Sequence, residues 1–307
     1  MDTEGVAVSR PRNRRPSLII IRLPLSSRDH HPPGKSKPMT THLDQIVAAA
    51  RLRVAEAKRE ADVRDLERQA EVYTPRGFRR RLEVTSQSGV AIIAELKKAS
   101  PSKGLIREEF DVAVLSRELE TAGAAALSVL TDQEFFQGSL LNLQLASKNT
   151  QLPCLRKDFI VDEFQLLEAR ANRADAVLLI VAALSSQDLI RLASAARKFE
   201  LDVLCEAHDE KELQAALDAG CDVVGVNNRD LRTFKVDLTT AFRLADRFPK
   251  DVLSVAESGI SNGGDIARLR AAGYGAFLVG ESLMKAPQPG EALRALIAGA
   301  RTPVSSF

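Results

Sequence analysis

The stretch Ala122-Gly123-Ala124-Ala125-Ala126-Leu127-Ser128-Val129-Leu130 decides the fold, because it joins the end of a helix to a buried strand. Glycine suits the left-handed backbone position after a helix, and a near-continuous apolar run is typical of a parallel strand covered on both faces. Similar stretches recur at 219–226 and 272–280, each with a glycine at the same place. A fourth copy, at 172–180, lacks the glycine, and there we expect Asn172 to be the left-handed residue. The body of the chain therefore repeats one strand–helix unit.

Extending this pattern along the chain gives eight strands. They are predicted at about 90–96, 124–130, 152–156, 176–181, 201–205, 222–226, 252–256 and 276–280. Helical periodicity follows them, as at 189–198, 211–219, 238–248 and 266–272, and one further helix is predicted before them at 43–71. Apolar strands that alternate with amphipathic helices predict an α/β protein, a (β/α)8 TIM barrel with an extra N-terminal helix. The main rival is a doubly wound sheet, which fits this count less well and usually shows a Gly-rich fingerprint after its first strand.

Residues 1–38 differ in composition from the rest. They contain six of the thirteen prolines, and eight Lys or Arg against three Asp or Glu, so they carry +5 and the remainder −3 of the net charge of +2. We expect a disordered extension here. The alternative is a targeting segment, because the Arg-rich and Ser-rich character matches a transit peptide in part. Met39 is an alternative start, since a helical pattern follows it directly. The domain prediction is an extension at 1–38 and a single catalytic barrel at 39–307.

Composition argues against several classes of protein. A net charge of +2 on 307 residues gives no sign of a nucleic-acid or membrane binder, and no apolar run has the length needed to span a bilayer. Cys154, Cys205 and Cys221 lack metal-ligand spacing, and the four histidines do not cluster with them, so we predict no metal site. Buried reduced thiols suit the cytoplasm, where we expect this chain to act.

Residues able to act on or bind a substrate, most of them polar or charged, gather at the C-terminal ends of six of the eight predicted strands. They are Glu95, Lys97 and Ser100 after the first strand, Lys157 and Phe159 after the third, Glu206 after the fifth, Asn227 and Arg229 after the sixth, Glu257 and Ser258 after the seventh, and Gly280 and Glu281 after the eighth. Taken alone, Glu95 and Lys97 would be a surface salt bridge. Recurrence at six ends is hard to explain by a solvated surface, because the preceding strands are apolar. In such barrels chemistry is built at this rim, so the pattern predicts an active site.

The last two strand ends also indicate a phosphate site. Ser258-Gly259 and Gly280-Glu281 follow the seventh and eighth strands, the usual place for a phosphate in these barrels. Glycine at 259 and 280 lets the backbone approach the phosphate closely. We expect the carboxylate of Glu281 to point away while its N–H donates. The alternative is that both glycines only form turns.

Several of these motifs resemble the indole-3-glycerol phosphate synthase family. The matching stretches, in order, are 93–102 (IAELKKASPS), 130–132 (LTD), 135–139 (FFQGS), 155–160 (LRKDFI), 225–231 (GVNNRDL), 256–260 (AESGI) and 280–284 (GESLM). The resemblance covers about residues 43–300 and leaves out the first 38. It implies conversion of 1-(2-carboxyphenylamino)-1-deoxyribulose 5-phosphate to indole-3-glycerol phosphate, with loss of CO₂ and water. This is the ring-closing, decarboxylating step of tryptophan biosynthesis, and it implies no cofactor and no metal.

The resemblance also implies a role for each rim residue. Lys157 would be the general acid, Glu206 the general base, and Lys97, oriented by Glu95, would hold the substrate and stabilise negative charge. The remaining residues would bind the substrate: Asn227 and Glu257 at the anilino portion, Ser100 and Arg229 at the carboxylate, and Ser258, Gly259, Gly280 and Glu281 at the phosphate. Phe159 would be a further substrate-binding residue. Which lysine donates which proton stays open on sequence alone.

Two other readings of the rim remain. One is another sugar-phosphate-binding barrel, such as an isomerase, although isomerase chemistry would call for a Cys or Asp acid–base pair at the strand ends. The other is a non-catalytic binder of a phosphate ligand, which would not need Lys157, Glu206 and Glu257 together. Expected partners are a small-molecule substrate, with no nucleic acid and no membrane, and we expect a monomer.

Overall fold

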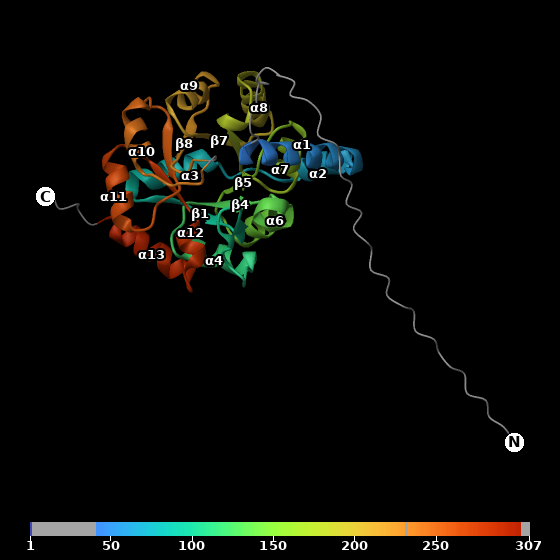
Figure 1. Ribbon diagram of the computed structural model, residues 1–307, viewed down its shortest axis with the longest axis horizontal. Coiled ribbons are helices and arrows are strands. Elements are labelled where there is room, and N and C mark those ends of the chain that lie inside the picture. The colour runs from blue at the N-terminus through green and yellow to red at the C-terminus, as the bar shows by residue number, and fades with distance from the viewer. Residues whose placement is uncertain (2–40, 231–232, 302–307) are drawn as a thin grey trace, which may run out of the picture. The chain divides into compact units, whose positions relative to one another are not determined.

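The computed structural model describes Met1 and residues 41–230 and 233–301. Eight parallel strands close into a barrel in the order β1-β10-β9-β8-β7-β6-β5-β4, with β4 paired to β1 (Figure 1). They are β1 (Ala91–Leu96), β4 (Ala126–Leu130), β5 (Cys154–Lys157), β6 (Ala176–Ile180), β7 (Asp202–Ala207), β8 (Val223–Asn227), β9 (Leu253–Glu257) and β10 (Ala276–Val279). The predicted TIM barrel is confirmed, with each strand end within two residues of its expected place. The predicted extension at 1–38 and the alternative start at Met39 fall, Met1 apart, outside the described residues.

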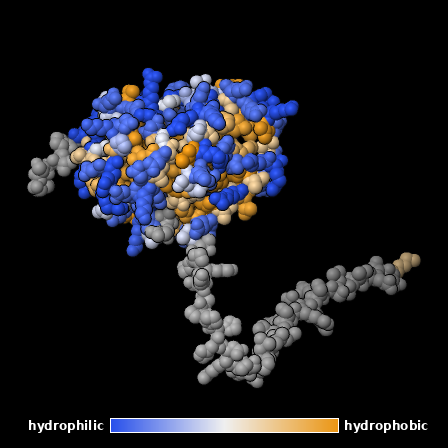
Figure 2. All heavy atoms as spheres, turned by 90° about the horizontal axis from the view of Figure 1, so that it is seen from above, coloured by the Kyte–Doolittle hydropathy of each residue, from blue (hydrophilic) through white to orange (hydrophobic). Residues whose placement is uncertain are grey.

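Helices follow the strands and form the outer layer of the barrel (Figure 1). They are α4 (Val112–Thr121), α5 (Gln133–Phe136), α6 (Leu140–Asn149), α7 (Phe164–Ala171), α8 (Ser186–Lys198), α9 (Glu210–Asp218), α10 (Thr239–Leu244), α11 (Gly263–Ala271), α12 (Glu281–Lys285) and α13 (Pro289–Gly299), with short 3₁₀ turns η1 (Val181–Ala183) and η2 (Ala245–Arg247). Figure 2 shows hydrophilic residues over most of the face seen from above, with hydrophobic atoms in smaller patches. Among the described residues, no helix is long and apolar enough to cross a membrane.

The segment before the first strand forms three helices, and the prediction of one helix over 43–71 is wrong. The chain forms α1 (His42–Glu60), then α2 (Val63–Val72) and α3 (Phe78–Ser88). Ala61 and Asp62 are extended, and the Asp62 side chain accepts the backbone N–H of Asp65 at 3.1 Å. An aspartate that caps a new helix competes with the helical backbone, which explains the break within a continuous apolar pattern.

The left-handed position of the repeat is occupied as expected in three copies and differently in the fourth. Gly123, Gly220 and Gly273 have positive φ values of 99°, 71° and 107°. In the fourth copy Arg173, with φ 68°, takes this position, so the expectation for Asn172 is wrong. Asn172 instead ends α7, and its side-chain amide donates to Glu168 O at 2.7 Å. The register of the helix–strand joint therefore fixes the backbone conformation even where the residue is not glycine.

Alternation along each strand separates two apolar clusters. Ile92, Ala94 and Leu96 of β1 belong to the cluster between strands and helices, whereas Ala91 and Ile93 belong to the cluster inside the barrel. Because strand side chains alternate, the next inward side chain after Ile93 is that of Glu95. The same alternation places a polar side chain after an inward apolar one on four more strands. These pairs are Lys157 after Leu155, Glu206 after Leu204, Glu257 after Val255, and Asn227 after Val223, the last with the inward position of Gly225 between them. The barrel core thus changes from apolar to charged at its carboxyl rim.

The two ends of the barrel are closed by different helices. Phe78 and Leu82 of α3 are fully buried in the inner cluster, and Arg79 donates its backbone N–H to Asp202 at the start of β7, so α3 covers the amino end. At the carboxyl end, Ile46 of α1 joins the same cluster from above. The charged rim therefore lies between an apolar core below and an apolar helix face above.

Candidate active site

A cavity of about 640 Å³ opens at the carboxyl rim of the barrel. All thirteen residues that the sequence singled out line it: Glu95, Lys97, Ser100, Lys157, Phe159, Glu206, Asn227, Arg229, Glu257, Ser258, Gly259, Gly280 and Glu281. The closed topology explains this convergence, because it sets neighbouring strand ends in register, with Asn227 opposite Glu257 and Ile180 opposite Glu206. The structure thus brings together the whole predicted set in one concave site, as expected for a small-molecule pocket.

Lys157 stands at the centre of the polar part of this cavity. Three carboxylates surround its ammonium group: Glu206 at 3.3 Å, Glu257 at 3.3 Å and Glu95 at 3.9 Å, measured from Nζ to the nearest Oε2. The Lys157 side chain is 13 % exposed and the carboxylates are nearly inaccessible. Burying such charges is costly unless they are paired, and here one cation faces three acids.

Glu95 connects this group to the second lysine. Its Oε1 pairs with the ammonium of Lys97, while its Oε2 faces Lys157. Room for this carboxylate comes from Gly280, where a Cβ atom would lie 2.5 Å from Oε1 and 2.8 Å from Cβ of Glu95. Gly225 does the same for Glu257, since a Cβ there would overlap its Oε1. Two glycines on the inner face of the barrel are therefore required by the acids opposite them.

The three acids do not share one protonation behaviour. Burial, together with Glu206 and Glu95, raises the pKa of Glu257 to about 8, although Lys157 opposes this. Burial also acts to raise the pKa values of Glu95 and Glu206, but neighbouring ammonium groups lower both below the ordinary value. Lys97 and Lys157 act on Glu95, and Lys157 acts on Glu206. For Lys157 burial acts to lower the pKa, and the three carboxylates more than reverse this and raise it.

At neutral pH this arrangement holds the Lys157 ammonium, the carboxylates of Glu95 and Glu206, and a protonated Glu257. Neither carboxylate oxygen of Glu257 makes a well-aligned hydrogen bond among the described residues, although Lys157 Nζ lies 3.3 Å from its Oε2. A proton donor beside a proton acceptor in a largely dry pocket is the arrangement needed for general acid–base chemistry. Pairs of titratable groups whose environments separate their pKa values are candidates for those two roles.

The strand ends after β9 and β10 form the other side of the cavity. Ser258 and Gly259 both have positive φ, 63° and 81°, so the chain turns sharply with its backbone toward the pocket. The carboxylate of Glu281 is held by Arg229 Nη2 at 3.1 Å and Lys285 Nζ at 2.6 Å. Although burial acts to raise its pKa, these cations lower it. Glu281 therefore stays ionised, with its charge neutralised by side chains rather than facing the pocket unpaired.

Sequence reasoning missed a second set of cavity residues. Leu43 and Ile46 of α1 and Phe136 after β4 add apolar surface, and Lys103 and Lys285 add two cations. Lys103 lies between the short antiparallel strands β2 (Ala99–Ser100) and β3 (Gly104–Leu105), a hairpin that the sequence did not predict. The apolar stripe of α1 was visible in the sequence, but its position over the rim was not, because it depends on tertiary packing.

Ion pairs hold α1 in that position. Arg53 of α1 donates to Asp132 at 2.6 Å and to Asp158 at 2.8 Å, and both acids are almost fully buried. Asp158 is also bound by Thr131 at 2.6 Å and by Arg156 at 3.1 Å. Asp158 follows Lys157 directly, so this network ties the rim helix to the strand that carries the central ammonium. No group of three or more His, Cys, Asp or Glu suited to a metal occurs in the described ranges.

This fold and this site define a (β/α)8-barrel enzyme with acid–base groups at the carboxyl rim. The family model of indole-3-glycerol phosphate synthase matches residues 43–296. A relative in Koribacter versatilis (strain Ellin345), an indole-3-glycerol phosphate synthase, is 56% identical over 259 residues, which is 84% of this chain and 100% of that protein. One of the same name in Burkholderia vietnamiensis is 47% identical over 256 residues, 83% of this chain and 98% of that protein. The chain belongs to the indole-3-glycerol phosphate synthase family.

Solved structures of low identity agree on the fold alone. A thiamine phosphate pyrophosphorylase from Pyrococcus furiosus superposes with a TM-score of 0.52 at 16% identity, over 68% of this chain and 95% of that one. At this identity the likeness carries the barrel architecture and no information on the reaction.

Proposed function

We propose that the chain catalyses the reaction of its family in tryptophan biosynthesis. The substrate would be 1-(2-carboxyphenylamino)-1-deoxyribulose 5-phosphate, and the products indole-3-glycerol phosphate, CO₂ and water. Family membership over residues 43–296 supports the reaction. The single observation that supports catalysis rather than binding is the Lys157 ammonium among Glu95, Glu206 and Glu257, because binding alone does not need a donor and an acceptor together.

Lys157 is proposed as the general acid of ring closure. When the aryl ring carbon attacks the ketone, aromaticity is interrupted and negative charge develops on the ketone oxygen. A nearby ammonium supplies both a proton and charge stabilisation at that oxygen. The three carboxylates raise the pKa of Lys157, so it is protonated before the attack. Loss of CO₂ then restores the aromatic ring.

Glu206 is proposed as the general base of the dehydration. This step needs a base for a proton and an acid for the departing hydroxyl. The pKa of Glu206 is lowered despite its burial, chiefly by Lys157, so it is ionised at neutral pH and able to accept the proton. Lys97, oriented by its ion pair with Glu95, would hold the substrate and stabilise developing charge.

The remaining polar groups are proposed to bind the aromatic half of the substrate. Asn227 and Glu257, neighbours across β8 and β9, would face the anilino portion and tune the lysines. Ser100 and Arg229 would contact the substrate carboxylate, and Phe159, which also lines the cavity, would be a further substrate-binding residue. Arg229 already donates to Glu281 and to Phe234 O, and a guanidinium has five N–H donors, so it has capacity for a carboxylate as well.

The phosphate is proposed to bind at the ends of β9 and β10. Ser258, Gly259, Gly280 and Glu281 would supply backbone and hydroxyl donors there. Lys103 and Lys285 line the same cavity, and both contribute to lowering the pKa of Glu281, so positive charge surrounds this corner. With its carboxylate held by Arg229 and Lys285, Glu281 adds no unpaired negative charge against a phosphate.

We further propose one catalytic domain at 39–307, cytoplasmic location and action as a monomer on a small molecule. The strands of the described residues and the residues that line the cavity lie within the unit Thr40–Phe307. The three cysteines are free and buried, which suits a reducing compartment.

The test is formation of product by the purified protein. The chain contains no Trp, so new indole fluorescence after mixing with the carboxyphenylamino-deoxyribulose phosphate must come from product. We expect the signal to grow over many turnovers, with CO₂ released in equal amount. Binding of the substrate without signal would refute the proposal in favour of a non-catalytic binder, and isomerisation of the sugar without CO₂ would favour the isomerase reading.

A further inference from the structure

His208 lies directly behind the proposed base and takes no part in the roles above. It follows β7, two residues after Glu206, and is not among the residues that line the cavity. Its Nδ1 lies 3.0 Å from Glu212 Oε2 on α9, and the same oxygen accepts the His208 backbone N–H at 2.8 Å. One carboxylate thus holds both the ring and the backbone of the histidine, which fixes the ring orientation.

The other ring nitrogen is directed at Glu206. His208 Nε2 lies 3.5 Å from Glu206 Oε1, is buried, and has no hydrogen bond among the residues that the structure describes. Glu206 Oε2 meanwhile accepts from Lys157 Nζ at 3.3 Å. The carboxylate of Glu206 therefore lies between an imidazole on one oxygen and an ammonium on the other.

The charges around the ring favour its protonated form. Burial acts to lower the pKa of His208, but the hydrogen bond with Glu212 and the charges of Glu206 and Glu212 raise it above its ordinary value, with a smaller contribution from Glu257 when that acid is ionised. These acids come from β7, α9 and β9. The short turn η1 also packs against β7 and α9, and its residues Val181–Ala183 carry no charge. An imidazolium here would stabilise the ionised form of Glu206, and His208 is one of the groups that lower the pKa of that acid.

We propose that His208, held by Glu212, is a positioning residue that fixes the orientation of the Glu206 carboxylate and keeps it ionised for proton abstraction. The proposal rests on the proposed role of Glu206 as base. A carboxylate with a hydrogen bond to one oxygen and a cation facing the other is restricted in rotation, and a cation beside it favours the charged form that a base requires. Glu212 acts through the ring, because it binds Nδ1 and leaves Nε2 to face Glu206.

The expected signature is a displaced acid limb in the pH profile of kcat. In His208→Gln one of the two cations beside Glu206 is lost and Lys157 remains, so Glu206 takes up a proton at higher pH and the acid limb moves upward. We expect a shift of about half to one pH unit and a fall in kcat of about tenfold, with KM changed by less than about twofold. Glu212→Gln should shift the limb in the same direction by less, because the ring remains.

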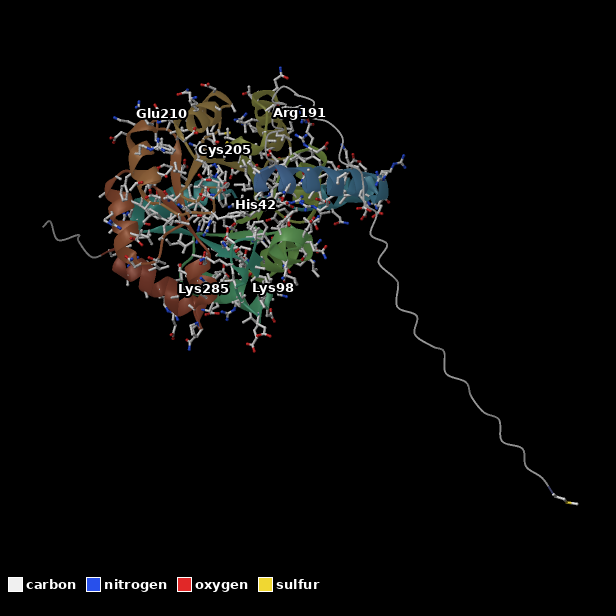
Figure 3. The ribbon with its side chains drawn as sticks, in the orientation of Figure 1. His42, Lys98, Arg191, Cys205, Glu210 and Lys285 are labelled. Atoms are coloured by element: carbon white, nitrogen blue, oxygen red, sulfur yellow. The ribbon has the colours of Figure 1, made fainter. Side chains whose placement is uncertain are left out.

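Two comparisons separate this role from a structural one. The double variant His208→Gln/Glu212→Gln should show the same acid limb as His208→Gln alone, because the effect of Glu212 on the protonation of Glu206 passes through the ring. Glu210→Gln is the matched control. Glu210 lies on α9, the helix that carries Glu212, but it is exposed at the periphery and paired with Arg247 (Figure 3). This variant should leave kcat and the limb unchanged. A merely structural histidine would lower the melting temperature of the variants without moving the limb.

An NMR titration of the histidine rings tests the same contacts without turnover. The chain has four histidines, and the resonance that disappears in His208→Gln belongs to the His208 ring. If that variant does not fold, the resonance that moves most in Glu212→Gln identifies the ring. We expect it to titrate above the ordinary histidine value of about 6.5 and to titrate lower in Glu212→Gln. A ring that titrates at or below the ordinary value in the wild-type protein overturns the proposal. If the wild-type enzyme turns over but the acid limb stays in place in both His208→Gln and Glu212→Gln, the proposal is also overturned. A wild-type protein without turnover would overturn the proposed function and this inference with it.

Discussion

Replacing Glu257 with glutamine removes one titrating group from the barrel and keeps its shape. The carboxyl is 1% exposed and its pKa is raised to about 8, mainly by burial. Above its ordinary pKa of 4.5 the unfolded chain releases this proton, whereas the folded protein keeps it until about pH 8. The folded state then binds more protons than the unfolded state, so the free energy of unfolding falls as pH rises through this window.

The size of the effect follows from the same shift. One unit of pH inside the window changes the free energy of unfolding by about 1.4 kcal/mol per proton, so about 2 kcal/mol accumulates between about pH 6 and about pH 8. Glutamine does not titrate, so Glu257→Gln should gain about 2 kcal/mol relative to the wild-type protein over that interval.

Urea unfolding followed by far-UV circular dichroism at the two pH values measures this difference. Glu210→Gln, which removes a surface acid paired with Arg247, is the control and should track the wild-type protein at both. A Glu257→Gln variant whose stability runs parallel to that of the wild type across the interval would refute the reasoning, because it would mean that Glu257 is already ionised in the folded protein at the lower pH.

Three further substitutions test other parts of the site. Gly225→Ala would place a Cβ against Glu257 Oε1, so kcat should fall by about tenfold or more while the fold is kept; unchanged kcat would show that the acid can move freely. Arg53→Met leaves Asp132 and Asp158 buried without their shared cation, so the free energy of unfolding should fall by about 2–3 kcal/mol in thermal unfolding. An unchanged melting temperature would contradict this. Lys103→Ala removes a cation from the phosphate corner, so KM should rise by about tenfold with little change in kcat, whereas an unaltered KM would remove Lys103 from that corner.

The sequence sufficed to predict the barrel because each strand–helix unit contains residues that mark where its helix ends and its strand begins. Apolar strands recur behind a glycine or its equivalent, and alternation along a strand fixes which side chains face inward. Glu95 could be placed with Lys97 on one face because both lie an even number of residues from Ile93. The rim residues could be found for the same reason, since parallel strands in a closed barrel end on one side.

What the sequence could not predict depends on contacts between distant residues. The helix breaks at Ala61 and Asp62, although the apolar periodicity of the sequence continues through both residues. A capping aspartate does not alter that periodicity, so the break could not be predicted from it. The partners of Arg229 and of His208 come from other elements, α12 and α9, whose distance from the strand ends is set by packing. Arg173 takes a left-handed backbone because the joint demands it, although its side chain does not favour it.

The most direct test of the account is the turnover of Lys157→Met, measured by indole fluorescence against the wild-type protein. Lys198→Met, an exposed lysine at the end of α8, is the matched control and should retain wild-type kcat. We expect kcat of Lys157→Met to fall by about a thousandfold or more, because proton transfer and charge stabilisation are lost together, while substrate still binds. A kcat within about tenfold of wild type, a cost of only about 1.4 kcal/mol, would contradict the assignment of Lys157 as the acid.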